Sequence, residues 1–126
     1  MLPLSRLSLP EGNREMYVFD LPAVSRNLDE MKTDRKEFLR VEPIAGRLER
    51  IGPGREITVP GEGAATIYYI VRGKGRVRSG ETTHEIASGS VVYAEPGCAH
   101  RFEDVTEPVE ALVVTATVAP LPASNG

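Results

Sequence analysis

Glycine and proline interrupt this sequence at short intervals, and their spacing limits the elements that the chain can form. The 12 glycines and 10 prolines separate short runs that are rich in Val, Ile, Thr and Tyr. Runs of that composition between turn residues are typical of β-strands. Strands are therefore predicted over Tyr17–Leu21, Phe38–Glu42, Arg47–Ile51, Glu56–Val59, Thr66–Val71, Gly75–Arg78, Thr82–Ile86, Ser90–Ala94, His100–Asp104 and Val109–Val118.

The segments between these runs contain the turn formers. Turns are predicted at Pro43–Gly46, Gly52–Gly54, Pro60–Gly63, Gly73–Gly75, Ser79–Glu81 and Pro96–Gly97. One short helix or a loop is expected within Leu21–Lys36, where Val24, Leu28 and Met31 follow one another at helical spacing. Many short strands with little helix indicate an all-β barrel or sandwich of antiparallel hairpins.

The length and composition fit one ordinary globular domain. A chain of 126 residues can bury a single core, and its 40% hydrophobic and 26% charged residues match average usage. The sequence contains no internal repeat and no linker that would divide it. We therefore expect a flexible amino-terminal extension over residues 1–15, one β-barrel domain over 16–118, and a polar carboxyl-terminal tail over 119–126.

Charge and cysteine content restrict the partners and the compartment. The formal net charge of −3 provides no positive field to attract a phosphate backbone, which argues against nucleic acid. No apolar stretch reaches the length of a membrane span or of a signal-peptide core. Cys98 is the single cysteine, so an intramolecular disulfide cannot form. These features predict a cytoplasmic protein that binds neither membranes nor nucleic acid.

Two segments carry a likeness to a known family. Residues 66–75 read TIYYIVRGKG, a strand that leads into a glycine turn, and residues 89–100 read GSVVYAEPGCAH, in which a glycine, a strand, a Pro-Gly turn and a histidine follow one another. These segments resemble the two characteristic motifs of the cupin superfamily. The resemblance implies a small antiparallel β-barrel with jelly-roll connections. It also implies a homodimer, in which Tyr17–Leu21 adds a strand to the partner's sheet.

The sequence departs from the family pattern at the metal ligands. The resemblance implies a His-x-His pair and a later Glu in the first motif, and one more His in the second. With Thr66 at the Glu position, the two His positions fall on Val59 and Gly61. Of the implied ligands His100 remains, and Glu62 is an irregular substitute.

One imidazole does not hold a catalytic metal, because zinc sites typically take three protein ligands and the non-haem iron pattern takes two His and one carboxylate. No cofactor is therefore expected. The alternative is one divalent transition metal at a rearranged site, which would use both histidines of the chain, His84 and His100, with Glu62, Glu56 or Glu95.

Alternation along the strands indicates which side chains face a ligand. Thr66, Tyr68 and Ile70 share one face of their strand. The resemblance turns that face toward the cavity, because Thr66 takes the place of the family's Glu. A mainly apolar pocket with a few polar groups suits a small organic molecule. The alternative is that these bulky side chains simply fill a small barrel.

The two histidines complete the predicted pocket. Phe102 shares the strand face of His100, and His84 shares the face of Ile86. The predicted ligand-binding residues are Thr66, Tyr68, Ile70, His84, His100 and Phe102. Two structural alternatives stay open: His84 is an ordinary solvent-facing residue, and His100 is a buried neutral imidazole.

Three functions are compatible with this pocket. The first is binding of a small organic ligand in a metal-free barrel. The second is a metal-independent isomerase, epimerase or cyclase, in which His100 and Glu62 are the catalytic residues that move a proton. The third is a mononuclear metalloenzyme with the rearranged site described above. A fold of this kind does not select among them.

Overall fold

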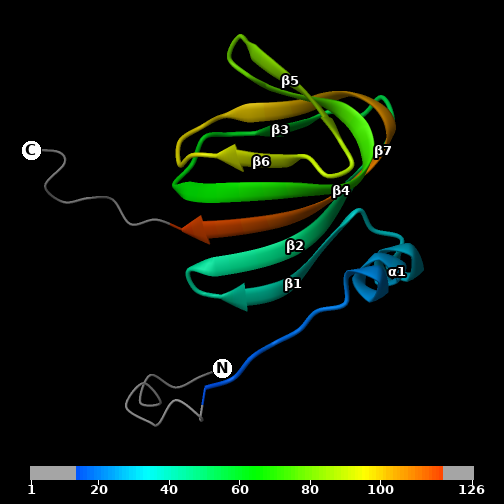
Figure 1. Cartoon of the computed structure of the whole chain (residues 1–126), viewed down its shortest axis with the longest axis vertical. Helices are drawn as coiled ribbons and strands as arrows, with labels where there is room; N and C mark the ends of the chain where they lie inside the picture. The colour runs from blue at the N-terminus through cyan, green and yellow to red at the C-terminus, as the bar shows by residue number, and fades with distance from the viewer. Residues whose placement is uncertain (1–13, 118–126) are drawn as a thin grey trace, which may run out of the picture.

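The computed structural model describes residues 14–117, in which one helix and seven strands follow one another along the chain (Figure 1). These elements are α1 (Leu21–Met31), β1 (Arg35–Val41), β2 (Ile44–Ile51), β3 (Ile57–Val59), β4 (Ala64–Ser79), β5 (Thr82–Ala87), β6 (Val91–Ala94) and β7 (His100–Thr117). The predicted tail over 119–126 and all but the last two residues of the predicted extension over 1–15 lie outside the described residues.

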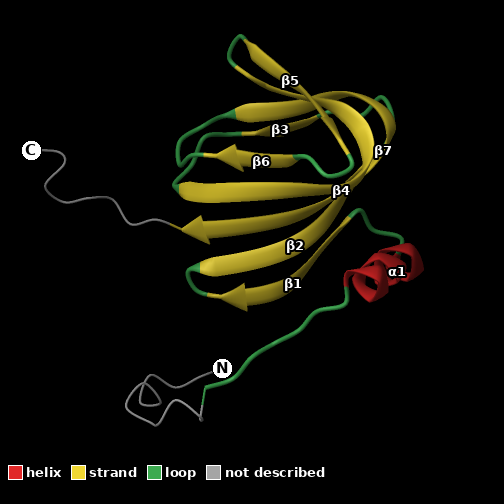
Figure 2. Ribbon diagram, viewed as in Figure 1, coloured by secondary structure: helices red, strands yellow, loops and turns green. Residues whose placement is uncertain are grey.

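The strands are antiparallel, and the two longest, β4 and β7, run through the middle of the sheet (Figure 2). The hydrogen-bonded order is β1-β2-β7-β4-β5, with β3 on β7 and β6 on β4. Residues 64–70 of β4 pair with 111–117 of β7, whereas 74–78 pair with 101–107. Each long strand therefore bends and contributes to two facing walls. The prediction of an all-β, antiparallel jelly-roll barrel with little helix is confirmed.

The predicted turn at Gly73–Gly75 is wrong, because β4 continues through it. Gly73 has φ 103°, and a Cβ at this position would collide with the Pro108 carbonyl oxygen. The register with β7 shifts on both sides of Lys74, as in β-bulges. Glycine therefore bends a strand here instead of ending it. Two predicted strands, His100–Asp104 and Val109–Val118, are likewise parts of one strand, β7, although the residues between them include no glycine.

The prediction of a strand over Tyr17–Leu21 is also wrong. Residues 14–20 form no regular element, and α1 begins at Leu21. Pro22 lies in the first turn of α1, where its fixed φ and its missing N–H are tolerated. The expected short helix is confirmed, with Leu28 fully buried. The one helix described over residues 14–117, α1, lacks the length and apolar character needed to cross a membrane.

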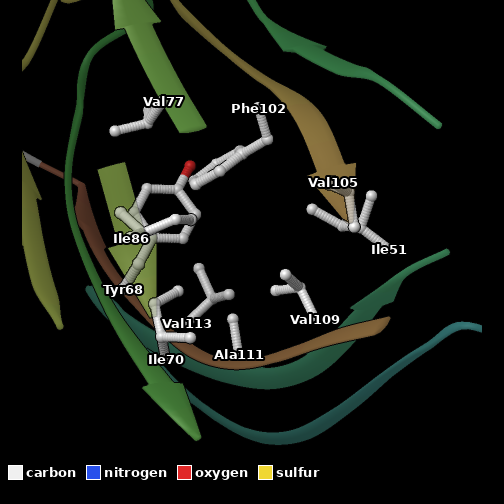
Figure 3. Close-up of a cluster of buried hydrophobic side chains, with 10 residues drawn as sticks. All are labelled: Ile51, Tyr68, Ile70, Val77, Ile86, Phe102, Val105, Val109, Ala111 and Val113. Atoms are coloured by element: carbon white, nitrogen blue, oxygen red, sulfur yellow. The ribbon is translucent and has the colours of Figure 1, made fainter. Parts of the chain in front are cut away.

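The inner faces of the two walls meet in one hydrophobic core (Figure 3). Its buried members are Ile51, Tyr68, Ile70, Val77, Ile86, Phe102, Val105, Val109, Ala111 and Val113. Full burial of a valine, isoleucine or phenylalanine side chain stabilises the fold by about 1.5–3 kcal/mol. The core fills the barrel at the level of Ile70, so space for a ligand is found toward Thr66 and His100, at the mouth of the barrel.

Candidate functional site

A buried hydrogen bond joins the two walls below the mouth of the barrel. The Tyr68 hydroxyl, on β4, lies 2.7 Å from His100 Nε2, at the start of β7. Tyr68 is 3% exposed and His100 is 6% exposed. Phe102 packs edge-on against both rings, with centroid distances of 4.8 Å to Tyr68 and 5.9 Å to His100. Three aromatic rings therefore hold one another in fixed orientation.

The protonation pattern of this pair follows from its partners. His100 Nδ1 lies 2.9 Å from the Cys98 carbonyl oxygen, which can only accept, so Nδ1 donates. In the neutral imidazole Nε2 is then the acceptor, and the Tyr68 hydroxyl donates to it. Burial raises the pKa of Tyr68 to about 12 and keeps this hydroxyl protonated at neutral pH. The Tyr68 oxygen retains lone pairs that can accept a hydrogen bond.

A cavity of about 150 Å³ lies at the mouth of the barrel, directly on this pair. Tyr68 and His100 line it, and its other polar side chains are Arg47, Glu62, Thr66, Glu95, Cys98 and Thr115. A second cavity, of about 20 Å³, lies deeper among core side chains that include Tyr68 and Phe102. We refer to the larger one as the mouth cavity.

Two wider depressions, each of about 590 Å³, lie away from this pair. One contains the ion-paired side chains of Arg50, Arg72 and Glu110, and the other contains those of Arg76 and Glu85. Their larger volume reflects open surface, and the arginines and glutamates named here already form ion pairs. The mouth cavity is therefore the better candidate site.

The structure brings together four of the predicted catalytic and ligand-binding residues. Glu62, Thr66, Tyr68 and His100 all line the mouth cavity. Glu62 is exposed at the rim of this cavity. Its backbone carbonyl oxygen accepts a hydrogen bond of 2.6 Å from the Gly97 N–H.

The other predicted pocket residues lie elsewhere. Ile70 is fully buried in the core, and Phe102 lines the deeper cavity below the pair. His84 is exposed on β5, opposite Val77 of β4, and lines neither cavity. The geometry therefore separates His84 from His100, which is the arrangement of an ordinary surface histidine.

Sequence reasoning missed a charged group inside the barrel. Arg47 Nε donates to Glu49 at 3.0 Å, and Arg35 Nη2 donates to the other oxygen of Glu49 at 2.9 Å. The Glu49 side chain is 9% exposed and that of Arg47 is 25% exposed. The strand pattern contained the signal, because Arg47 and Glu49 share a face with the core residue Ile51.

The sheet register places Arg47 in line with the aromatic pair. Arg47 of β2 is paired with Val113 of β7, and Val113 is paired with Tyr68 of β4. Arg47 and Tyr68 therefore occupy the same row of the wall, about 10 Å apart along the hydrogen-bonding direction. Both side chains line the mouth cavity and the deeper cavity.

The residues present do not fit the metal centre that the cupin resemblance implies. Val59, Gly61 and Thr66 offer no histidine or carboxylate at three of the expected positions. Both ring nitrogens of His100 are engaged in hydrogen bonds. Over residues 14–117, no three His, Cys, Asp or Glu side chains gather as a metal site requires. The rearranged site with His84 is not assembled.

Comparisons with known proteins agree with this fold. The family model described as "Cupin domain" matches residues 47–115. An uncharacterized protein of Streptomyces coelicolor is 30% identical over 94 residues, which cover 69% of this chain and 90% of that protein. A solved structure from Thermus thermophilus is 27% identical, with a TM-score of 0.65, and the match covers 81% of this chain and 98% of that one.

A second solved structure, of a Rhizobium leguminosarum protein of unknown function, has a TM-score of 0.69 at 19% identity, with 83% of this chain and 100% of that one covered. The matched residues 47–115 include Arg47, Tyr68 and His100. The resemblance seen in the two motifs is thereby confirmed, and this chain belongs to the cupin family.

Proposed function

We propose that this protein binds a small organic molecule in the mouth cavity, with Tyr68 and His100 as the hydrogen-bonding pair at its base. The observation that carries the proposal is the 2.7 Å hydrogen bond between these side chains, buried at the point where the cavity reaches the core. The proposal includes no cofactor, because the side chains that line the cavity do not form a metal site.

The volume of the cavity limits the size of the ligand. Apolar cavities of about 150 Å³ are known to bind benzene, whereas pockets for drug-sized ligands span about 300–1,000 Å³. A mouth cavity of about 150 Å³ therefore fits a molecule with about six to ten non-hydrogen atoms. Because the Tyr68 hydroxyl donates its hydrogen bond to His100 Nε2, the ligand presents a hydrogen-bond donor to the Tyr68 oxygen.

Ligand-detected NMR with a library of fragments of this size tests the proposal. We expect fragments that bind the wild-type chain to lose about tenfold in affinity with Tyr68→Phe, which removes the hydroxyl and keeps the ring. His84→Ala is the matched control and should leave affinity unchanged, because His84 is exposed and lines neither cavity. Fragments that bind equally well to the Tyr68→Phe variant would contradict the proposal.

A second candidate function is metal-independent proton transfer by His100 and Glu62. It is favoured by one observation, that both side chains line the mouth cavity, one at its base and the other at its rim. NMR detection of product from bound fragments distinguishes the two functions. In a binding protein, His100→Ala weakens affinity and no product forms with any variant. In an enzyme, Glu62→Gln and His100→Ala lower turnover.

We propose in addition that the chain forms a homodimer. Residues 14–20 form no strand in the single chain, and the outer face of β4 and β6 offers a second interface. Four apolar side chains lie there at 41–65% exposure: Ile67, Tyr69, Val91 and Tyr93. Ile67 is paired with Tyr93 and Tyr69 with Val91, so the four form one patch. Light scattering at micromolar concentration tests this, and a monomer would contradict it.

A further inference from the structure

We infer that the ligand of the mouth cavity is a small monocarboxylate, and that Arg47 binds its carboxylate group. The inference rests on the proposed function and adds the chemical class of the ligand. Four features of the barrel interior support it: the charge around Arg47, its unused donors, its place in the sheet, and the acidic rim of the cavity.

Arg47 shares its carboxylate partner with a second arginine, while Glu37, its register neighbour on β1, makes its side-chain hydrogen bonds with Arg40. Arg35 and Arg47 both donate to Glu49, so two guanidinium groups share one carboxylate. Arg35 is the more exposed partner, with 60% of its side chain accessible, whereas Arg47 is 25% exposed and lines the cavity. The attraction between a guanidinium and an anion is stronger at a partly buried position than in bulk water, because the effective dielectric constant is lower there.

Arg47 also has donors to spare. Its Nε is used by Glu49, and its two terminal nitrogens make no hydrogen bond with any residue of the described range 14–117. A guanidinium carries five N–H donors in a planar fork, which matches the two oxygens of a carboxylate. Lysine would supply the same charge without this bidentate geometry.

The sheet register sets how far the ligand must reach. Arg47 and Tyr68 lie two strands apart, on either side of Val113, which separates them by about 10 Å in the wall. A ligand with its carboxylate on Arg47 and a hydroxyl on the Tyr68 oxygen crosses β7 between them, where Thr115 lines the mouth cavity. A short hydroxycarboxylic acid has this arrangement of groups.

The rim of the cavity limits the charge that the ligand can carry. Glu62 and Glu95 line the mouth and are exposed. Their negative charges disfavour an anion at the rim, so the carboxylate of the ligand is placed at the inner wall, beside Arg47. A second carboxylate on the ligand would face this acidic rim, so a monoanion is favoured over a dianion.

The test compares an acid with its neutral isostere on the wild-type protein. The probes are 4-hydroxybutyrate and 4-hydroxybutanamide, which have the same size and shape and differ in the charged end. Titration followed by ¹⁵N-detected shifts of the protein gives both dissociation constants. We expect the acid to bind at least about tenfold more tightly, with an affinity that falls as salt is added.

Variants assign the effect to Arg47. Arg47→Gln should remove the preference for the acid, so that the dissociation constants of acid and amide become about equal. Arg47→Lys should retain part of the preference. The matched control is Arg55→Gln, which removes the same charge from an exposed position outside both cavities. The control should keep the wild-type preference. A change that Arg55→Gln shares would mean that net charge, not Arg47, is responsible.

The outcomes separate this inference from the proposed function. Equal binding of acid and amide to the wild-type chain would overturn the carboxylate inference and leave the small-molecule site standing. If neither probe binds, while uncharged fragments of the library described above do, the same conclusion follows. If nothing binds in the mouth cavity, the proposed function fails and this inference fails with it. The wild-type comparison decides even if Arg47→Gln does not fold.

Discussion

The wall built from β2, β7, β4 and β6 has opposite character on its two faces. Near the mouth its inner face carries Arg47, Thr66 and Tyr68, whereas its outer face carries the exposed patch of Ile67, Tyr69, Val91 and Tyr93. An antiparallel sheet of a soluble domain usually buries apolar side chains and exposes polar ones. The reversal is confined to the mouth, because farther in the same inner face carries the core residues Ile70, Ala111 and Val113. The inner face suits a ligand, and the outer face suits a second copy.

The largest expected effect comes from two isoleucines of β4 that lie on opposite faces. Ile70 is 0% exposed and Ile67 is 45% exposed. Ile70→Ala should lower the free energy of unfolding by about 2–5 kcal/mol, because it leaves a cavity in the core. Ile67→Ala should cost less than about 1 kcal/mol in the monomer. Urea denaturation measures both, and equal losses would show that the faces are not distinct in this way.

The next effect concerns Tyr68 and alkaline pH. Burial raises the pKa of Tyr68 to about 12, against about 10 in the unfolded chain. The unfolded state therefore loses its proton first. The stabilising contribution is complete below about pH 10 and falls by about 1.4 kcal/mol per pH unit between about pH 10 and 12. Denaturation at several pH values should show this slope.

A matched pair of variants isolates that contribution. Tyr68→Phe should remove the alkaline slope, whereas Tyr69→Phe, on the exposed face of the same strand, should keep it. If both variants lose the slope by the same amount, the alkaline sensitivity does not arise from burial of Tyr68.

A smaller effect is expected on the outer face. Tyr93→Glu places a charge in the proposed interface. In a two-fold dimer both copies contribute the same patch, so the substitution places one negative charge on each side. Dimer dissociation should become at least about tenfold easier by analytical ultracentrifugation, with little change in unfolding of the monomer. Glu95→Gln, at the rim of the mouth cavity, is a control that should leave the dimer intact.

The smallest expected effect is that of metal removal. Both ring nitrogens of His100 are engaged in hydrogen bonds, and the family's other ligand positions carry neither histidine nor carboxylate. Chelator treatment should therefore leave stability and ligand affinity unchanged. Elemental analysis should find iron, zinc, manganese, nickel and copper well below one per chain. Stoichiometric metal that disappears in His100→Ala would contradict the metal-free reading of the site.

Local patterns of the sequence predicted much of the fold. The alternation of Thr66, Tyr68 and Ile70 correctly assigned them to the inside, since neighbouring side chains of a strand point to opposite faces. Glycine was less informative. At Gly73 glycine permits a positive φ within a strand. A glycine in the sequence does not distinguish this use from a turn. The amino-terminal run from Tyr17 failed as a strand because alternation does not supply a pairing partner.

The candidate site was predicted less completely than the fold. Tyr68 and His100 were singled out, but their hydrogen bond depends on the bend of β7, which carries His100 across to the wall opposite Tyr68. Arg47 and Glu49 were passed over, because a charged strand residue is usually solvated. This ion pair is largely buried because β2 lies between β1 and β7 in the sheet.

The sequence by itself determined the strand content, the inward set of β4, the cupin resemblance and the loss of the family's metal ligands, since all of these depend on residue type and short spacing. Only the tertiary structure decided which polar groups converge. It separated His84 from His100, joined His100 to Tyr68, and set Arg47 in the same row. The physical reason is that strand pairing brings together residues far apart in the chain, and its register is fixed by the packing of the whole barrel.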